Sequence, residues 1–372
     1  MLPIRLGRRS PDAWAERLGR RGRVLRALVL TTIGALLLSV AGAAALYVKL
    51  DGNIAHVDID AALGTDRPED SAGDSIDILV LGSDARSERG AGVYGAAAGA
   101  RSDTAMIVHV SADRSAATVV SIPRDTLVSR PDCRRPDGST AQAADRVMFN
   151  EAYQVGGPAC AVRTVESLTG IRMDHYVEID FQGFERLVNT LGGVEITTTE
   201  PIDDAKSHLS LPAGTHTLDG EQALALVRTR KAIGDGSDLA RIQLQHDFLR
   251  ALVDQIGGVG LLTNPGRLYD LADAATSAVT TDSDLASVSQ LTDLAGALRA
   301  IESDDLHLIT LPVTYDSEDV NRVVPLTERA EQVWTALRRD RPVPESATRG
   351  SAAEADGDIV AGHDGGNGEP AE

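Results

Sequence analysis

The longest uninterrupted apolar run of the chain lies near its amino terminus. The segment ALVLTTIGALLLSVAGAAALYV, residues 27–48, contains no charged side chain over about 22 residues, enough for a helix to cross a bilayer. A cleavable signal peptide is the alternative, because AGAAA resembles a small-residue cleavage site. Its apolar region would be shorter, however, and we therefore favour an uncleaved transmembrane helix.

Beyond this run, strand-like and helix-like patterns alternate along the chain. Short apolar runs rich in β-branched residues predict an antiparallel hairpin at residues 104–123 and strands at 76–84, 175–181, 194–199 and 305–313. Helical spacing predicts helices at residues 159–170, 181–193, 219–230 and 237–256, the third of which ends as an extended segment. This alternation predicts an α/β fold, a single α-β-α sandwich with a mixed central sheet.

The flanking segments differ in composition from this alternating part. The chain contains no internal repeat, and the patterned part has the size of one domain. We expect a basic segment at residues 1–26, the transmembrane helix at 27–48, a polar linker at 49–75, the domain at 76–342 and a disordered acidic tail at 343–372.

Charge is distributed unevenly along the chain. The net charge is −19, yet residues 1–48 contain eight arginines and only two acids. By the positive-inside rule, the basic end lies in the cytoplasm and the acidic bulk lies outside the membrane. Such an acidic bulk argues against nonspecific binding of nucleic acid phosphates. Aromatic residues are 3% of the chain, so its core must consist mainly of Ala, Val, Leu and Ile.

The chain has two cysteines, Cys133 and Cys160, both in the part expected outside the cytoplasm. In an oxidising compartment a cysteine pair favours a disulfide. Two buried thiols are the alternative. The sequence has no CxxC motif or Cys/His cluster, so a structural zinc site is not expected.

Polar residues gather at the ends of the predicted strands. Asp84 follows the first strand, and a hairpin would bring its two open ends together. Arg101 and Asp103 lie at one end, and Arg124 and Asp125 at the other. A surface cluster of ion pairs is the alternative interpretation.

The segment LVRTRKAIGDGSDLARIQLQ adds a second basic group. Arg228 and Arg230 are two residues apart, so on an extended segment they point the same way. Arg241 and Gln245 are four apart, so they share one face of a helix that starts at Ser237 or Asp238. Converging guanidinium groups repel one another unless an anion lies between them. Basic residues on a solvated face are the alternative.

Together these groups predict a site for a pyrophosphate. Aspartates hold a hard cation such as Mg²⁺, and arginines with the metal bind pyrophosphate and stabilise its transfer. The sequence has no Walker loop or kinase signature, so ATP is not the expected donor. For a domain tethered outside the membrane, the expected donor is a lipid-linked pyrophosphate.

The motifs and their order also resemble a known family. LVLGSDAR, RSDTAMIVHV, VVSIPRDTLV, FNEAYQVGGPACAVRTVESLTGI, LGGVEI, LDGEQALALVRTR and DLARIQLQHDFL follow one another as in the LytR-CpsA-Psr family of cell-wall glycopolymer ligases. The two cysteines and the Ala/Gly/Arg-rich composition resemble actinobacterial members. The likeness covers residues 76–256 and continues more weakly to about residue 337.

The resemblance implies a phosphotransferase whose domain has the fold of this family. It implies transfer of a glycopolymer, such as teichoic acid, arabinogalactan or a capsule-like polymer, from a polyprenyl pyrophosphate carrier to a peptidoglycan hydroxyl. It implies Mg²⁺ or Mn²⁺ binding by Asp84 and Asp103, with Arg101, Asp103 and Arg124 as catalytic residues. The resemblance also implies that a set of polar side chains binds the pyrophosphate: Arg101, Arg124, Arg228, Arg230, Arg241 and Gln245.

Two other functions use the same features. A lipid pyrophosphate hydrolase would have the same site with water as the acceptor. A non-catalytic envelope or transcriptional regulator would need a basic helix-turn-helix, and the expected cytoplasmic segment of about 26 residues is too short for one.

Overall fold

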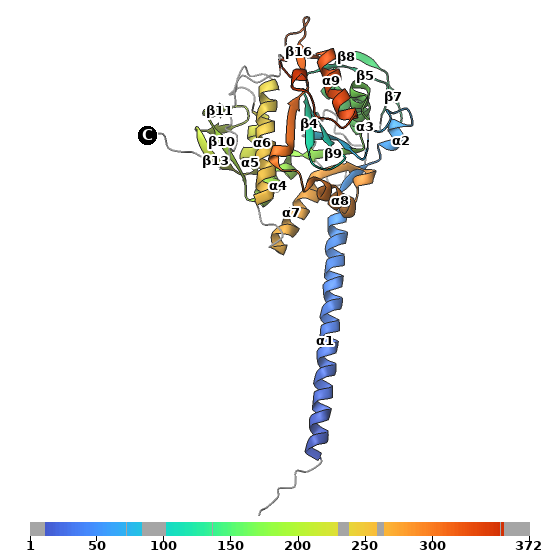
Figure 1. Ribbon diagram of the computed structural model, residues 1–372, viewed down its shortest axis with the longest axis vertical. Helices are drawn as coiled ribbons and strands as arrows, with labels where there is room; N and C mark the ends of the chain where they lie inside the picture. The colour runs from blue at the N-terminus through green and yellow to red at the C-terminus, as the bar shows by residue number, and fades with distance from the viewer. Residues whose placement is uncertain are drawn as a thin grey trace, which may run out of the picture. The chain divides into compact units, whose positions relative to one another are not determined.

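A computed structural model of the chain describes residues 12–71, 73–83, 102–135, 137–229, 238–258, 264–349 and 351–352. The chain divides into two units, Met1–Gly52 and Asn53–Glu372, and each is described separately below (Figure 1).

The first unit contains one long helix, α1 (Asp12–Asp51). Its portion Leu25–Asp51 has a mean hydropathy of 2.1 and is not buried within the protein. A core helix of a soluble protein would be buried, so this exposure of an apolar helix fits a lipid environment. The predicted apolar helix is confirmed by length and composition.

The second unit is built on a seven-stranded mixed sheet. The pairs β14–β9, β2–β3 and β3–β4 are antiparallel, and the remaining pairs are parallel. The predicted mixed sheet is therefore confirmed. In spatial order its strands are β1 (Ala55–Val57), β14 (Val279–Asp282), β9 (His175–Asp180), β2 (Ile76–Ser83), β3 (Ser102–Val110), β4 (Ala117–Ile122) and β15 (Leu306–Thr310).

Helices cover both faces of this sheet, which gives the α-β-α sandwich (Figure 1). Ile107 of β3 packs into the main core, to which α2 (Asp60–Leu63), α3 (Phe149–Thr169) and α9 (Thr327–Arg338) contribute. The neighbouring Val108 points to the other face, where it joins Leu249 of α6 (Asp238–Gly258). Alternate residues of a strand face opposite sides, so the near-continuous apolar strands supply both cores.

The other helices of the described residues are α4 (Phe181–Leu191), α5 (Gly220–Arg228), α7 (Pro265–Ala278) and α8 (Val288–Leu298). Within the part of the chain that the structure describes, five small antiparallel sheets connect the elements: β5 (Leu127–Arg130) with β8 (Ala144–Met148), β6 (Cys133–Arg134) with β7 (Thr140–Ala141), β10 (Val194–Thr198) with β13 (Gly214–Leu218), β11 (Ile202–Asp204) with β12 (Leu209–Leu211), and β16 (Val313–Tyr315) with β17 (Val323–Pro325).

Capping residues explain where α4 ends and where α4 and α5 begin. The side chain of Asp180 caps α4 by accepting from the amide of Gly183, and Gly192 ends it in the left-handed region. Asp219 and Gln222 form a reciprocal capping box at the start of α5. These signals were readable in the sequence, and the predicted helix starts are confirmed.

Two segments that we expected outside the domain contribute to it. Within the expected linker, β1 pairs with β14, and Leu63 is almost completely buried in the main core. Within the expected acidic tail, Ala347 is buried in the same core, and the Ser351 hydroxyl donates to the carbonyl of Val313. The predicted boundaries between linker and domain and between domain and tail were both wrong. Leu63 and Ala347 are single apolar residues in polar stretches, so they produce no periodic pattern in the sequence, although each packs into the core.

The predicted disulfide is present and joins Cys133 of β6 to Cys160 of α3, with 5.3 Å between the Cα atoms. Helix α3 is longer than the predicted 159–170, and it is interrupted at Gly157, whose φ is 68°. At Gly156 an added Cβ would lie 2.6 Å from the Cβ of Cys160. Only glycine therefore leaves room for the disulfide to pack against the helix backbone.

The disulfide should stabilise the domain measurably. Replacing both cysteines by alanine should lower the free energy of unfolding by about 3 kcal/mol, because the bond closes a loop of 27 residues in the unfolded chain. Thermal unfolding of the full chain in detergent, with and without reductant, measures this. Reductant should destabilise the wild type and leave the double variant unchanged. Equal sensitivity of both proteins would contradict the prediction.

A buried histidine links the C-terminal end of α9 to the sheet. His109 of β3 contacts Asp77 through Nδ1 at 2.8 Å and Asp340 through Nε2 at 3.2 Å. Asp77 also accepts from the Ser71 hydroxyl at 2.7 Å. Burial opposes the charged imidazole, but the hydrogen bonds and charges of Asp77 and Asp340 outweigh it and raise the pKa of His109.

A raised pKa means that the protonated form of His109 stabilises the fold. This contribution is complete below the unfolded pKa of about 6.5 and is lost as the pH rises through the folded pKa. His109→Gln should therefore lower the melting temperature more at pH 5.5 than at pH 8.5. The exposed His307→Gln is the control, with no pH-dependent difference expected. A His109→Gln effect that grew with pH would refute the assignment.

Candidate functional site

The site forms where the open end of the β3–β4 hairpin meets the first turn of α6. Ala105 of β3 pairs with Ile122 of β4, so the residues just before Ala105 and just after Ile122 lie at the same end of the sheet. This confirms the predicted hairpin. It places the backbone of Asp103 at the same sheet end as Arg124.

One carboxylate joins the two basic parts of the site. Asp238, the first residue of α6, accepts from the backbone amide of Arg124 at 3.2 Å and lies 3.5 Å from its Nε. The same carboxylate lies 2.6 Å from Nη2 of Arg241, one turn along the helix. Arg124 and Arg241 therefore lie close together, and the carboxylate of Asp238 holds them there. The sequence had indicated Asp238 only as a helix cap.

Arg241 is an unusually buried cation. Its side chain is 4% exposed, and that of Asp238 is 10% exposed. Removing a charged pair from water costs several kcal/mol per ion before its mutual attraction is counted. An arrangement that does not maximise stability is common where a site binds a charged ligand. The buried pair therefore favours a functional role for this end of α6.

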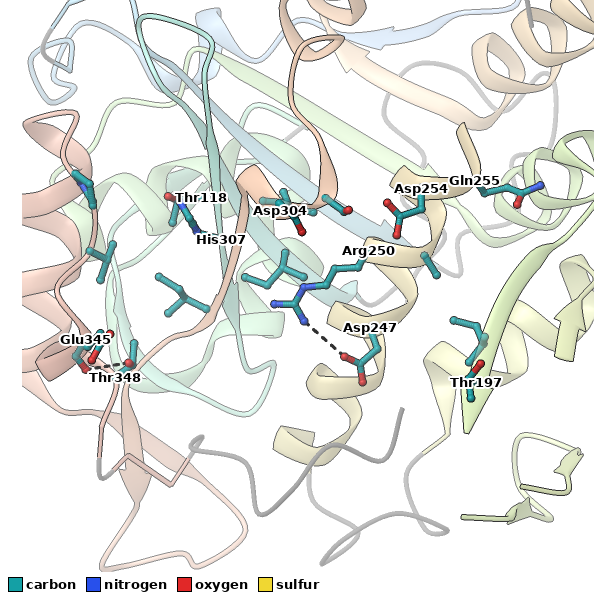
Figure 2. A pocket seen from close by; sticks show the side chains of 18 of the residues that line it. Thr118, Thr197, Asp247, Arg250, Asp254, Gln255, Asp304, His307, Glu345 and Thr348 are labelled. Carbon is teal, nitrogen blue, oxygen red and sulfur yellow. Dashed lines mark hydrogen bonds and ion pairs between the residues drawn. The ribbon is translucent and has the colours of Figure 1, made fainter. Parts of the chain in front are cut away.

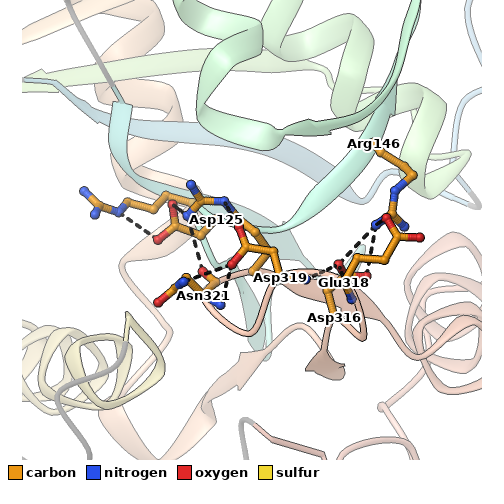
Figure 3. A network of polar contacts seen from close by, with 8 residues as sticks. Asp125, Arg146, Asp316, Glu318, Asp319 and Asn321 are labelled. Carbon is orange, nitrogen blue, oxygen red and sulfur yellow. Dashed lines mark hydrogen bonds and ion pairs between the residues drawn. The ribbon is translucent and has the colours of Figure 1, made fainter.

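A second carboxylate, that of Asp125, lies beside Arg124. Asp125 also lies next to the loop between β16 and β17, near Asp319 and Asn321 (Figure 3). Asp125 lies 3.4 Å from Nε of Arg124 and 3.4 Å from Nη1 of Arg322. The loop between β16 and β17 holds Arg322 through Asp319, and its Asp316 pairs with Arg146.

Three guanidinium groups gather at this end of the sheet. Arg124, Arg241 and Arg322 contact the carboxylates of Asp125 and Asp238, and Arg322 also contacts Asp319. We call Arg124, Arg241, Arg322, Asp125 and Asp238 the arginine cluster. In a strongly acidic protein, guanidinium groups gathered in one place are suited to an anionic ligand.

Gln245 ties three elements together beside the arginine cluster. Its amide nitrogen donates to the hydroxyl of Thr104 on β3 at 3.1 Å and to the carbonyl of Val227 on α5 at 3.0 Å. Gln245 and Arg241 are four residues apart on α6, as the sequence predicts. Gln245 therefore fixes the C-terminal end of α5, where Arg228 lies, to the same helix that carries Arg241.

Arg228 does not occupy the predicted extended segment. It is the last residue of α5, and the extended conformation begins at Thr229. The prediction failed because the helical pattern of residues 220–228 continues to its end without a stop signal. The Arg228 guanidinium lies 5.0 Å from the centroid of the Phe181 ring, a cation–π contact that orients it.

Three predicted site residues, Asp84, Arg101 and Arg230, lie outside the described residues. For Asp103 the strand β3 is described, but its side chain is not. On the described strand ends, Ser83 of β2 pairs with Ser102 of β3, the residue before Asp103. The side chains that the structure describes contain no group of three or more metal-ligating residues.

A buried pair beneath the site was not predicted. The hydroxyl of Ser121 on β4 lies 2.9 Å from Nε2 of His246 on α6. Burial, with a smaller effect of the Arg250 charge, lowers the pKa of His246 to about 4, so the imidazole is neutral. Both side chains are almost fully buried. The pair therefore links β4 to α6 next to Arg124 and Gln245, and the sequence holds no local signal for it.

The fold and the site together define a class: an α-β-α sandwich with an arginine cluster at one end of a mixed sheet, in a chain that also carries an apolar helix. The chain belongs to the LytR_cpsA_psr family, whose model matches residues 46–339.

Characterised relatives come from two bacterial groups. The cell wall biosynthesis protein LcpA of Corynebacterium glutamicum is 31% identical over 393 residues, which cover 95% of this chain and 73% of LcpA. The polyisoprenyl-teichoic acid–peptidoglycan teichoic acid transferase TagT of Bacillus subtilis is 36% identical over 240 residues, which cover 61% of this chain and 69% of TagT. The corynebacterial relative fits the actinobacterial resemblance.

Solved structures share the fold. A LytR-Csp2A-Psr enzyme from Actinomyces oris has a TM-score of 0.58 and 26% identity, covering 77% of this chain and 96% of that enzyme. TagT bound to LIIa-WTA has a TM-score of 0.52 and 28% identity, covering 75% of this chain and 95% of TagT. The predicted family and fold are confirmed.

Asp238 should contribute far more to the free energy of unfolding than a carboxylate in a first helical turn usually does, because it pairs with the buried Arg241. Asp238→Ala would leave the buried Arg241 without this carboxylate and should cost about 3 kcal/mol of unfolding free energy. Asp247→Ala is the matched control: Asp247 pairs with Arg250 at the same spacing on α6, at 3.7 Å, but Arg250 is 48% exposed.

The control should cost about 0.5 kcal/mol, as is usual for an exposed pair. Urea unfolding of the full chain in detergent, followed by the fluorescence of the buried Trp334, measures both variants. Equal losses for Asp238→Ala and Asp247→Ala would show that burial of the Asp238–Arg241 pair does not matter.

Proposed function

We propose that the protein is a membrane-anchored phosphotransferase. It moves a glycopolymer from a polyprenyl pyrophosphate carrier to a hydroxyl group of peptidoglycan. The observation that carries the proposal is the arginine cluster, in which the carboxylate of Asp238 holds the guanidinium groups of Arg124 and Arg241 together at the end of the sheet. A pyrophosphate supplies the anion that such a cluster is built to bind.

The relatives support this choice of substrate class. TagT of Bacillus subtilis is named a polyisoprenyl-teichoic acid–peptidoglycan teichoic acid transferase, and a solved structure shows TagT bound to LIIa-WTA. At 28% identity and a TM-score of 0.52, that structure shares more than the general fold with this chain. The name of TagT describes transfer of a polyisoprenyl-linked glycopolymer to peptidoglycan, and the arginine cluster is suited to a pyrophosphate in such a donor.

In the reaction, a peptidoglycan hydroxyl oxygen attacks the phosphorus that carries the glycopolymer. A new P–O bond forms to that oxygen, the bridging P–O bond of the pyrophosphate breaks, and polyprenyl phosphate leaves. The proton of the acceptor hydroxyl is released to solvent, which balances the step. Arg124, Arg228 and Arg241 stabilise the negative charge that develops on the phosphoryl oxygens, and Arg101, Arg230 and Gln245 complete the proposed binding set.

Asp84 and Asp103 are the proposed ligands for Mg²⁺ or Mn²⁺. The pairing of Ser83 with Ser102 supports this, because it starts both aspartates from adjoining strand ends. Carboxylates are the donors that a hard divalent cation prefers. When bound, the cation would neutralise part of the pyrophosphate charge.

The orientation in the membrane is also proposed. Helix α1 contains an apolar portion long enough to cross a bilayer, and eight arginines lie within residues 1–26. The positive-inside rule places that end in the cytoplasm. The domain then lies outside, next to the lipid carrier and the cell wall.

Arginine substitutions test the proposal. Arg124→Ala and Arg228→Ala should each lower the transfer rate by about 100-fold or more, since each removes charge stabilisation from the transition state. The assay uses the full chain in lipid nanodiscs, a synthetic polyprenyl-pyrophosphate oligosaccharide and purified peptidoglycan. Arg186→Ala, an exposed arginine of α4, is the control and should keep wild-type activity. Full activity in either cluster variant would disprove the assignment.

The acceptor separates a transferase from a hydrolase. Release of polyprenyl phosphate should require peptidoglycan, and the oligosaccharide should become covalently attached to it. Equal release in the absence of peptidoglycan would instead identify a hydrolase. Mass spectrometry of lipid that co-purifies with the full chain provides a further test, because a polyprenyl phosphate in the site would establish the donor class.

A further inference from the structure

A cleft of about 800 Å³ lies away from the arginine cluster, beside the last strand of the sheet (Figure 2). One wall includes four consecutive residues of β15, from Leu306 to Ile309, and another includes three consecutive residues of β10, from Glu195 to Thr197. Successive side chains of a strand point to opposite faces. A cleft that touches consecutive residues must therefore run along the edges of these strands.

The edge of β15 that faces away from β4 is open. Among the described residues, β15 pairs only with β4. The amide of Leu311 donates to the carbonyl of Ser121 at 2.9 Å, on the β4 side. Backbone groups alternate in direction along a strand, so the amides of Leu308 and Thr310 point away from β4. Of these two residues, Leu308 lines the cleft, so its outward backbone groups can pair with a further extended segment.

The sequence of β15 does nothing to protect this edge. Proteins usually block an open strand edge with proline, lysine or another charge, or with a bulge. The strand LHLIT contains none of these residues, and its five positions pair with β4 in unbroken register. An open, regular and unprotected edge next to a cleft is the arrangement that binds an added strand.

The cleft is negatively charged. Its lining includes Glu195, Asp254 and Asp304, which are exposed and form no ion pair among the described residues. Asp247 and Glu345 also line it, and each already pairs with an arginine. The acids come from four separate segments, so they surround the strand edge on several sides (Figure 2).

We propose that this cleft binds an extended, basic polypeptide segment of a partner protein, which adds a strand to the edge of β15. Backbone pairing with Leu308 supplies affinity, and the surrounding acids select lysine and arginine side chains. The surface lies outside the arginine cluster, so partner binding is independent of the proposed transfer reaction.

Charge excludes two other occupants. A second copy of the chain would bring β15 against β15 and place the same acids opposite one another. Residues 353–372 of this chain contain six acidic residues and no lysine or arginine. A basic partner is the occupant whose charge matches the cleft.

The test uses a synthetic peptide of about eight residues with alternating lysine and threonine, long enough to span β15. The full chain is held in nanodiscs of zwitterionic lipid, so that the peptide does not bind the membrane. Calorimetry should show binding of this peptide and none of a glutamate–threonine counterpart. The lysine peptide with alternate amides N-methylated should bind at least about tenfold more weakly, because it cannot complete the backbone ladder.

Protein variants separate the contribution of the β15 backbone to peptide binding from that of the acidic side chains. Leu308→Pro removes an outward amide, whereas the matched Leu308→Ala keeps it; the first should weaken binding about tenfold or more and the second by less than about threefold. The combined variant Glu195→Gln, Asp254→Asn, Asp304→Asn should also weaken binding about tenfold, and the exposed Asp293→Asn on α8 should not.

Failure of the lysine peptide to bind the wild type would overturn the proposal. So would equal binding of the N-methylated peptide, a result that does not depend on whether Leu308→Pro folds. Binding that survives the loss of the three acids would show that charge does not select the partner, and would equally overturn it.

Discussion

The site depends on one carboxylate. Asp238 lies at the start of α6, yet its contacts reach the backbone of Arg124 beyond β4 and the guanidinium of Arg241 one turn along the helix. It therefore sets the position of α6 relative to the sheet end. Gln245 and the Ser121–His246 pair repeat that connection further along the same helix. The arginines are held by the packing of helix against sheet, and little adjustment is needed when an anion arrives.

The same chain separates its charges by location. Its acidic surface keeps the net charge at −19, and guanidinium groups gather at one end of the sheet. Buried cations cost stability, so the cluster depends on the carboxylates of Asp125 and Asp238, which compensate the charge of the arginines. The same carboxylates hold the guanidinium groups in place, where an arriving polyanion can compete for them.

The sequence predicted the sheet and most of the arginine cluster for the same reason: both follow from periodic patterns. The β3–β4 hairpin and the i, i+4 spacing of Arg241 and Gln245 are local features. Asp238, Arg322 and His246 could not be found in this way, because their partners lie 114, 197 and 125 residues away along the chain. Arg228 was placed on the wrong element because helix α5 ends without a sequence signal.

The disulfide between Cys133 and Cys160 makes the stability of the domain depend on where it folds. Both sulfur atoms are buried beside a glycine-lined turn of α3, so once formed the bond is shielded from exchange. In a reducing compartment the bond does not form. A copy that stayed in such a compartment would thus remain the looser protein and be the easier one to degrade. The crosslink therefore distinguishes molecules that folded in an oxidising compartment from those that did not.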